Sequence, residues 1–121
     1  MLDGVAFTLR VGQHSASLLA EQRRRQVECS AFITAWNPFS QSLSAAENAS
    51  RQSELARELA RQGLSFLKGV GQHPSNDWPG EDSLLVFGLS RDAARALGTR
   101  LEQNAIVWSG SDAVPELILL R

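Results

Sequence analysis

The fold is decided by the stretch Ala31-Phe32-Ile33-Thr34-Ala35-Trp36-Asn37-Pro38. Its apolar part predicts a well-buried strand over residues 31–36. The strand is expected to end at Asn37-Pro38, because proline has no N–H to donate to a β-ladder. An amide side chain at the exit of a buried strand is typical of a tight turn, and it is also typical of a small-ligand site.

A helix is expected to follow this turn. Ser44 and Glu47 form a capping box, with serine at the N-cap and glutamate at N3. The helix should run to about Gln62, and Gly63 fits as the left-handed residue beyond its end. An apolar stripe of mostly small residues follows the helical repeat and predicts that the helix lies close on a sheet: Ala45, Ala49, Leu55, Ala56, Leu59 and Ala60.

The rest of the chain alternates between strand and helix patterns. Val5–Val11 alternates like a half-buried strand, and Ser15 is the expected N-cap of a helix to about Arg25. Further elements are expected in this order: a strand over 64–70, a loop over 71–82, a strand over 83–89, a helix capped by Ser90 with Gly98 at a close contact, and strands over 105–108 and 117–120.

This order predicts a two-layer α+β sandwich. The six central elements follow the βαββαβ order of a ferredoxin-like core. An extra strand and helix precede this core, and one more strand follows it. A length of 121 residues suits one domain over residues 1–121.

The predicted topology gathers distant polar residues at one edge of the sheet. The exit of strand 31–36, the start of the next helix, the 71–82 loop and the end of the last helix all lie at the same end. The candidate ligand-binding residues are therefore Asn37, Glu47, Asn48, Arg51, Glu81, Gln103 and Asn104. No catalytic residue is assigned within this set.

The chemistry of this set suits a ligand with hydrogen-bonding edges. The amides offer donors and acceptors, and Arg51 suits a carboxylate or phosphate. Trp36 or Trp78 is placed to stack on a ring. Glu47 and Glu81 are candidates for a general acid and base if burial separates their pKa values.

Each candidate also has a purely structural explanation. The capping box alone accounts for Glu47, and an Asx-type turn accounts for Asn37. Arg51 is spaced to pair with Glu47 at i,i+4 on the helix surface. Asn104 suits a helix C-cap, and Glu81 suits a charged hairpin loop. Only the coincidence of all of them at one edge favours a ligand site.

Composition limits the function classes. The net charge of −1 and the pI near 6.1 argue against a nucleic-acid binder. No apolar run approaches the roughly 18 residues that a membrane span needs. Met1-Leu2-Asp3-Gly4 has neither the basic nor the apolar region of a secretory signal. The single cysteine, Cys29, excludes an internal disulfide and suits a cytoplasmic protein with a buried, unreactive thiol.

We expect neither a metal nor a cofactor. His14 and His73 are 59 positions apart and lack ligand spacing. The basic run Arg23-Arg24-Arg25 has no aromatic residues interleaved and suits a solvated helix end. The chain has no tyrosine, which argues against an RNA-binding sheet. Its apolar end strands, Val5–Val11 and 117–120, are candidate sheet edges, and a homodimer formed by sheet-edge pairing would bury them.

Four motifs, in this order along the chain, resemble a small bacterial family known as domain of unknown function 3293. They are residues 32–38, Glu47-Asn48 with Arg51, Glu81-Asp82-Ser83, and Gln103-Asn104-Ala105-Ile106. The resemblance covers nearly the whole chain and implies that these positions act as a set. It implies no activity. The stretch Trp78-Pro79-Gly80-Glu81 departs from the acid-containing loop of that family.

Two functions follow as hypotheses. The first is binding of a small polar or nucleotide-like ligand at one edge of the sheet, and the groups there are compatible with hydrolase or transferase activity. The alternative is a non-catalytic structural or regulatory module that binds other proteins. The sequence leaves open whether the protein is an enzyme.

Overall fold

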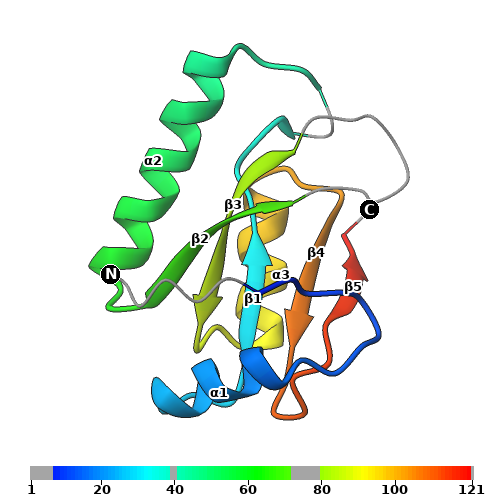
Figure 1. Cartoon of the computed structure of the whole chain (residues 1–121). Coiled ribbons are helices and arrows are strands. Elements are labelled where there is room, and N and C mark those ends of the chain that lie inside the picture. The colour runs from blue at the N-terminus through cyan, green and yellow to red at the C-terminus, as the bar shows by residue number, and fades with distance from the viewer. Residues whose placement is uncertain (1–6, 39–40, 72–79, 121) are drawn as a thin grey trace.

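A computed structural model describes residues 7–38, 41–71 and 80–120 (Figure 1). Its elements are α1 (Ala16–Arg24), β1 (Ser30–Ile33), α2 (Ala45–Arg61), β2 (Ser65–Gly71), β3 (Glu81–Phe87), α3 (Arg91–Arg100), β4 (Ala105–Ser109) and β5 (Glu116–Leu119). The strands form one antiparallel sheet in the order β2-β3-β1-β4-β5. The prediction of an α+β protein is confirmed.

The strand register brings several chain turns to one end of the sheet. Ile33 at the end of β1 lies opposite Leu84 of β3. Gly71 at the end of β2 lies opposite Glu81 at the start of β3. β4, which also pairs with β1, begins at this end with Ala105. The loop after β1 therefore emerges beside the start of β3 and beside the connection from α3 to β4.

Each face of the sheet carries its own apolar cluster. On one face α2 and α3 pack against the strands through Leu55, Leu59, Ala94, Leu97, Ile33, Val86 and Ile106. On the other face Leu18 of α1 packs with Leu85 and Phe87. In Figure 1, α3 lies behind the sheet, and α1 lies in front of it near its lower end. The strand residues alternate between these two clusters, as a pleated sheet requires.

Local capping signals are confirmed at all three helices. A serine hydroxyl accepts a hydrogen bond from a first-turn backbone N–H in each case, from Ser15, Ser44 and Ser90. Gly63 has the expected left-handed backbone, with φ of +75°. At Gly98, a methyl group would lie 2.7 Å from side-chain atoms of both Ile106 and Leu120. Glycine is therefore what allows α3 to lie this close to the sheet.

The predicted strand over Val5–Val11 is wrong for the part that the structure describes. Residues 7–11 belong to no strand, and the earlier ones lie outside the described residues. Phe7 and Leu9 pack against the α1-side cluster, and the segment crosses in front of the sheet (Figure 1). The Gly12 N–H holds it by a 2.7 Å bond to the Pro115 carbonyl. An extended segment laid across a sheet face shows the same alternation as a strand within the sheet.

β1 is shorter than predicted, because side chains replace the ladder after Ile33. The Ala35 N–H donates to Gln52 Oε1 at 3.0 Å, and the Trp36 N–H donates to Thr34 Oγ1 at 3.0 Å. Thr34 Oγ1 itself donates to the Asp82 carbonyl at 2.6 Å. Residues 34–37 therefore leave the sheet and approach α2.

The small residues of α2 do not lie on the sheet as predicted. Leu55 and Leu59 are buried, but Ala45, Ala49 and Ala60 are exposed. Ala56 alone among the alanines of the stripe is partly buried. The first half of α2 therefore stands off β2 and β3.

Among the described residues, no helix combines the length and apolar character needed to cross a bilayer.

Candidate ligand site

Asn37 is the centre of the polar loop that follows β1. Its backbone is left-handed, with φ of +44°, a conformation that asparagine tolerates better than most residues. Its Oδ1 accepts from the Leu43 N–H at 3.0 Å and from Asn48 Nδ2 at 2.7 Å. Its own N–H donates to Asn48 Oδ1 at 2.8 Å. Asn48 is 2% exposed, so this pair joins the loop to α2 away from water.

Arg51 joins two loops through their backbone carbonyls. Its Nε donates to the Ala35 carbonyl at 2.8 Å, and its Nη2 donates to the Leu101 carbonyl at 2.8 Å. The carboxylate that Arg51 approaches is that of Glu102, at 3.9 Å, rather than that of Glu47 as the spacing suggested. Arg51 thus ties the exit of β1 to the end of α3.

Gln103 reaches the same loop from the other side. Its Nε2 donates to the Trp36 carbonyl at 3.1 Å and to the Leu101 carbonyl at 3.3 Å. Gln103 is buried, and its neighbour Asn104 is exposed. The Asn104 carbonyl accepts from the Leu120 N–H at 2.9 Å, which fixes the chain beside β5.

The two candidate carboxylates have different surroundings. Glu81 Oε2 accepts from Asn37 Nδ2 at 3.4 Å, so β3 contributes to the polar loop. Glu47 Oε1 instead accepts from the Ser44 N–H at 3.1 Å, as its capping box requires. That backbone hydrogen bond, with a weaker contribution from the Ser44 hydroxyl, lowers the pKa of Glu47.

The loop therefore gathers most of the predicted set. Hydrogen bonds join Asn37, Asn48 and Glu81 directly, and Arg51 and Gln103 bind the same loop through its carbonyls. Glu47 belongs to the helix cap, and the Asn104 backbone binds the C-terminal segment. Much of the polar capacity of the set is thus used within the protein. Ligand binding by these seven residues stays a prediction.

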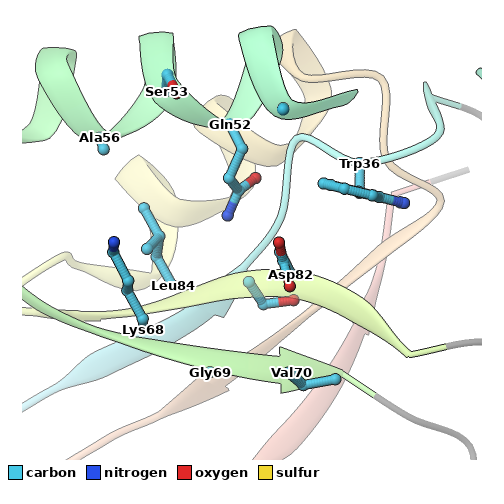
Figure 2. Close-up of a pocket in the computed structure, with 11 residues that line it drawn as sticks. Trp36, Gln52, Ser53, Ala56, Lys68, Gly69, Val70, Asp82 and Leu84 are labelled. Carbon is cyan, nitrogen blue, oxygen red and sulfur yellow. The ribbon is translucent and has the colours of Figure 1, made fainter. Parts of the chain in front are cut away.

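A groove of about 430 Å³ lies beside this loop, between α2 and the paired strands β2 and β3 (Figure 2). We call it the α2 groove. Its lining comes from four segments of the chain, which are the loop after β1, α2, β2 and β3: Trp36; Ala49, Gln52, Ser53 and Ala56; Lys68, Gly69 and Val70; and Asp82, Ser83 and Leu84. None of the seven predicted residues is in this lining. Gln52 and Asp82 were within reach of sequence analysis, because they lie one helical turn after Asn48 and directly after Glu81.

The side-chain amide of Gln52 has a hydrogen-bond partner at its oxygen but not at its nitrogen. Its Oε1 accepts from the Ala35 N–H at 3.0 Å, which fixes the orientation of the amide. Its Nε2 is buried and has no hydrogen-bond partner. In Figure 2 this side chain descends from α2 with its nitrogen toward the strands. The groove therefore contains an unmet donor, and a buried donor without a partner costs about 1–3 kcal/mol.

Charges of both signs line the floor of the groove. Asp82 pairs with Val70 in the sheet, and Lys68 pairs with Leu84 two residues along. In Figure 2 the Asp82 carboxylate points up toward Gln52, while Lys68 lies nearer Ala56. Trp36 lies at the Asp82 end of the same space. A carboxylate, an amide donor and an indole ring therefore line the same groove, with an ammonium group farther along.

A second hollow of about 190 Å³ lies at the same end of the sheet. Its lining includes Phe32, Thr34, Glu81, Gln103 and Leu117. Two of the predicted residues, Glu81 and Gln103, belong to it. The Gln103 amide already donates to two carbonyls, and the Glu81 carboxylate already accepts from Asn37. This hollow therefore offers fewer unmet groups than the α2 groove.

The histidine and cysteine side chains in the described part of the chain lie outside both hollows. Among those residues, no group of three or more His, Cys, Asp and Glu is placed to hold a metal ion. His14 Nδ1 lies 2.7 Å from the Asp112 carbonyl, whereas His73 and Trp78 lie outside the described residues. Burial raises the pKa of the Cys29 thiol, and the nearby charge of Glu28 adds to this effect.

Fold and site together define an α+β protein whose antiparallel sheet carries a polar loop and an adjoining groove. The family model described as "Protein of unknown function (DUF3293)" matches residues 33–106. That match covers more than half of the 121 residues, and the chain belongs to this family, as the motif resemblance indicated. The matched segment contains all seven predicted residues and the whole lining of the α2 groove. No curated protein and no solved structure matches the chain.

Proposed function

We propose that the protein binds a small polar, nucleotide-like ligand in the α2 groove. The observation that carries this proposal is the buried Gln52 Nε2, which has no partner. Buried polar groups in proteins nearly always have one, so an acceptor from outside the chain is a natural partner here. The indole of Trp36 and the charges of Lys68 and Asp82 add the stacking surface and the polar groups that small-ligand sites use.

In this proposal the predicted polar set mainly positions the groove. Asn37, Asn48, Arg51 and Gln103 fix the loop that carries Trp36. Their removal should therefore disturb both folding and binding. Hydrolase or transferase activity stays a prediction, and Asp82 is the carboxylate in the groove that such chemistry would use as a base.

We infer a ferredoxin-like core for the part of the fold around this groove. The inference is supported by the chain order β1-α2-β2-β3-α3-β4 and by the sheet order β2-β3-β1-β4, with β5 added beyond β4. One domain over residues 1–121 and a cytoplasmic location in a bacterium stay predictions. The location is supported by the single cysteine and the lack of any possible internal disulfide.

The test is native mass spectrometry of freshly purified protein with one groove-filling variant. Ser53 lines the groove and Ser50 does not, and both are exposed on α2. Ser53→Trp should abolish a co-purified small molecule, because the indole occupies its space. Ser50→Trp should retain it. Equal retention by both variants contradicts ligand binding in this groove.

The alternative, an interaction module, has one observation in its favour. Leu117 and Leu119 on β5 are 53% and 67% exposed. β5 pairs with β4 and ends the described sheet, so its outer edge is available for sheet-edge pairing in a homodimer. The same mass spectra report the subunit count. A dimer that Leu119→Lys dissociates, with no co-purified ligand in the wild type, would favour this alternative.

A further inference from the structure

We propose that the ring bound in the α2 groove carries a guanine-type edge, and that the ligand is a purine nucleotide with such a base. This inference rests on the proposed ligand binding and names its substrate class. It follows from which groups face the groove, where each lies relative to Trp36, and which of them already have partners.

The first element is a donor of fixed orientation. Because Gln52 Oε1 accepts the Ala35 N–H, the amide cannot rotate without losing that bond. Its NH₂ group therefore points toward the strand floor of the groove as a buried donor without a partner, so a ligand that reaches it must present an acceptor. The O6 atom of guanine or hypoxanthine is such an acceptor, whereas adenine has a donor NH₂ group at that position.

The second element is a carboxylate in the same groove that points toward Gln52. The Asp82 residue binds Thr34 through its backbone carbonyl, which leaves the carboxylate out of that contact. Its carboxylate points into the groove on the side of β3 that faces α2. An ionised carboxylate only accepts, and it can accept two adjacent N–H donors. Guanine presents such a pair, N1–H and the 2-amino group, directly beside O6.

The remaining elements account for the ring face and the phosphate. Trp36 lies at the Asp82 end of the groove, where its indole can stack on the base. Lys68 lies two residues along β2 from Val70, the partner of Asp82. An ammonium group farther along the groove suits a phosphate at the far end of the nucleotide.

The experiment is titration calorimetry on the full chain with GMP, IMP and AMP. Wild-type protein should bind GMP best, IMP less well because it lacks the 2-amino group, and AMP at least about tenfold more weakly than GMP. Asp82→Asn and Gln52→Glu should each weaken GMP binding by about tenfold or more. Glu54→Gln, an exposed change on α2 outside the lining, should leave GMP binding unaltered.

The most discriminating variant reverses the hydrogen-bonding character of Gln52 and Asp82 together, so that the donor becomes an acceptor and the acceptor gains a donor. Gln52→Glu combined with Asp82→Asn presents an acceptor where adenine has its NH₂ and a donor where adenine has N1. The carboxylate introduced by Gln52→Glu can still accept the Ala35 N–H, so the fold keeps that bond. The double variant should prefer AMP to GMP. Lys68→Ala should weaken GMP and leave guanosine unchanged, which separates phosphate binding from base binding.

Two results would overturn the inference. One is equal binding of GMP and AMP by the wild-type protein. The other is an unchanged GMP-to-AMP ratio in the double variant. If Ser53→Trp still displaces a co-purified molecule of another class, the groove remains a ligand site and only its guanine specificity fails. If Ser53→Trp changes nothing, the proposed function itself fails.

Discussion

Asn48 binds both the backbone and the side chain of Asn37. Its Oδ1 accepts the Asn37 N–H at 2.8 Å, and its Nδ2 donates to Asn37 Oδ1 at 2.7 Å. Asn48 is buried on α2, and Asn37 has a left-handed backbone in the loop that follows β1. One buried amide thus fixes the turn that carries Trp36 into the α2 groove.

Asn48→Ala should lower the free energy of unfolding by about 1–3 kcal/mol, because the Asn37 N–H and Oδ1 both lose their buried partner. Urea denaturation followed by circular dichroism measures the change. Ser50→Ala, an exposed change two residues along the same helix, is the matched control and should be near neutral. Equal effects of the two variants would show that the amide pair contributes nothing.

Gly98→Ala should destabilise the protein by about 1–3 kcal/mol, although alanine is the better helix former. The added methyl meets Ile106 and Leu120 at 2.7 Å, and both neighbours belong to the packed core on this face of the sheet. Thermal unfolding shows whether Gly98→Ala lowers or raises the stability of the protein. Ala96→Gly, at an exposed site of α3, measures the effect of helix propensity alone on the free energy of unfolding, which is about 1 kcal/mol. A stabilised Gly98→Ala protein would contradict the close approach of α3.

Glu47 should make stability pH-dependent at acid pH. Its pKa is lowered in the folded state, so its contribution is complete above the unfolded pKa, about 4.3, and is lost as the pH falls through the lower folded pKa. Glu47→Gln keeps a capping-box acceptor that does not ionise. Urea midpoints of the two proteins should therefore converge as the pH falls from about 5 to about 3. If the urea midpoints of the two proteins instead change with pH in parallel, the Glu47 carboxylate does not contribute to stability in this way.

Cys29 should react slowly with iodoacetamide at about pH 7.5, because burial raises its thiol pKa and little thiolate is present at that pH. The measurement is the alkylation half-time by mass spectrometry in the native protein, compared with the same protein in urea. Denaturation should accelerate the reaction severalfold. A native rate equal to the unfolded rate would show an accessible, ordinary thiol.

Local signals predicted the helices because each signal lies within one turn of sequence. Ser44 and Glu47, or Ser90 alone, carry the capping information in adjacent residues. Chain order then predicted which ends of the elements meet, and the bonds from Asn37 to Asn48 and Glu81 lie at that end. These inferences needed only periodicity and direction.

Sequence analysis did not predict the groove, because the groove exists where the start of α2 does not contact the sheet. Ala45 and Ala49 have the spacing of a buried stripe, yet α2 stands off β2 at this end and leaves them exposed. Similarly, Phe7 and Leu9 alternate as a strand does, but they lie across the sheet face. Side-chain spacing does not distinguish these arrangements, since the deciding contacts come from residues far along the chain.

The Arg51 clamp, by which we mean its hydrogen bonds to the Ala35 and Leu101 carbonyls, has a consequence for the order of folding events. Its two carbonyl partners, Ala35 and Leu101, lie 16 and 50 residues away in the sequence. Closing the longer loop costs more chain entropy, so the clamp should be completed only after α3 has docked. Arg51→Met should therefore chiefly accelerate unfolding and leave the refolding rate nearly unchanged in a chevron measurement. The residue that closes the polar loop is then a determinant of how long the native state persists.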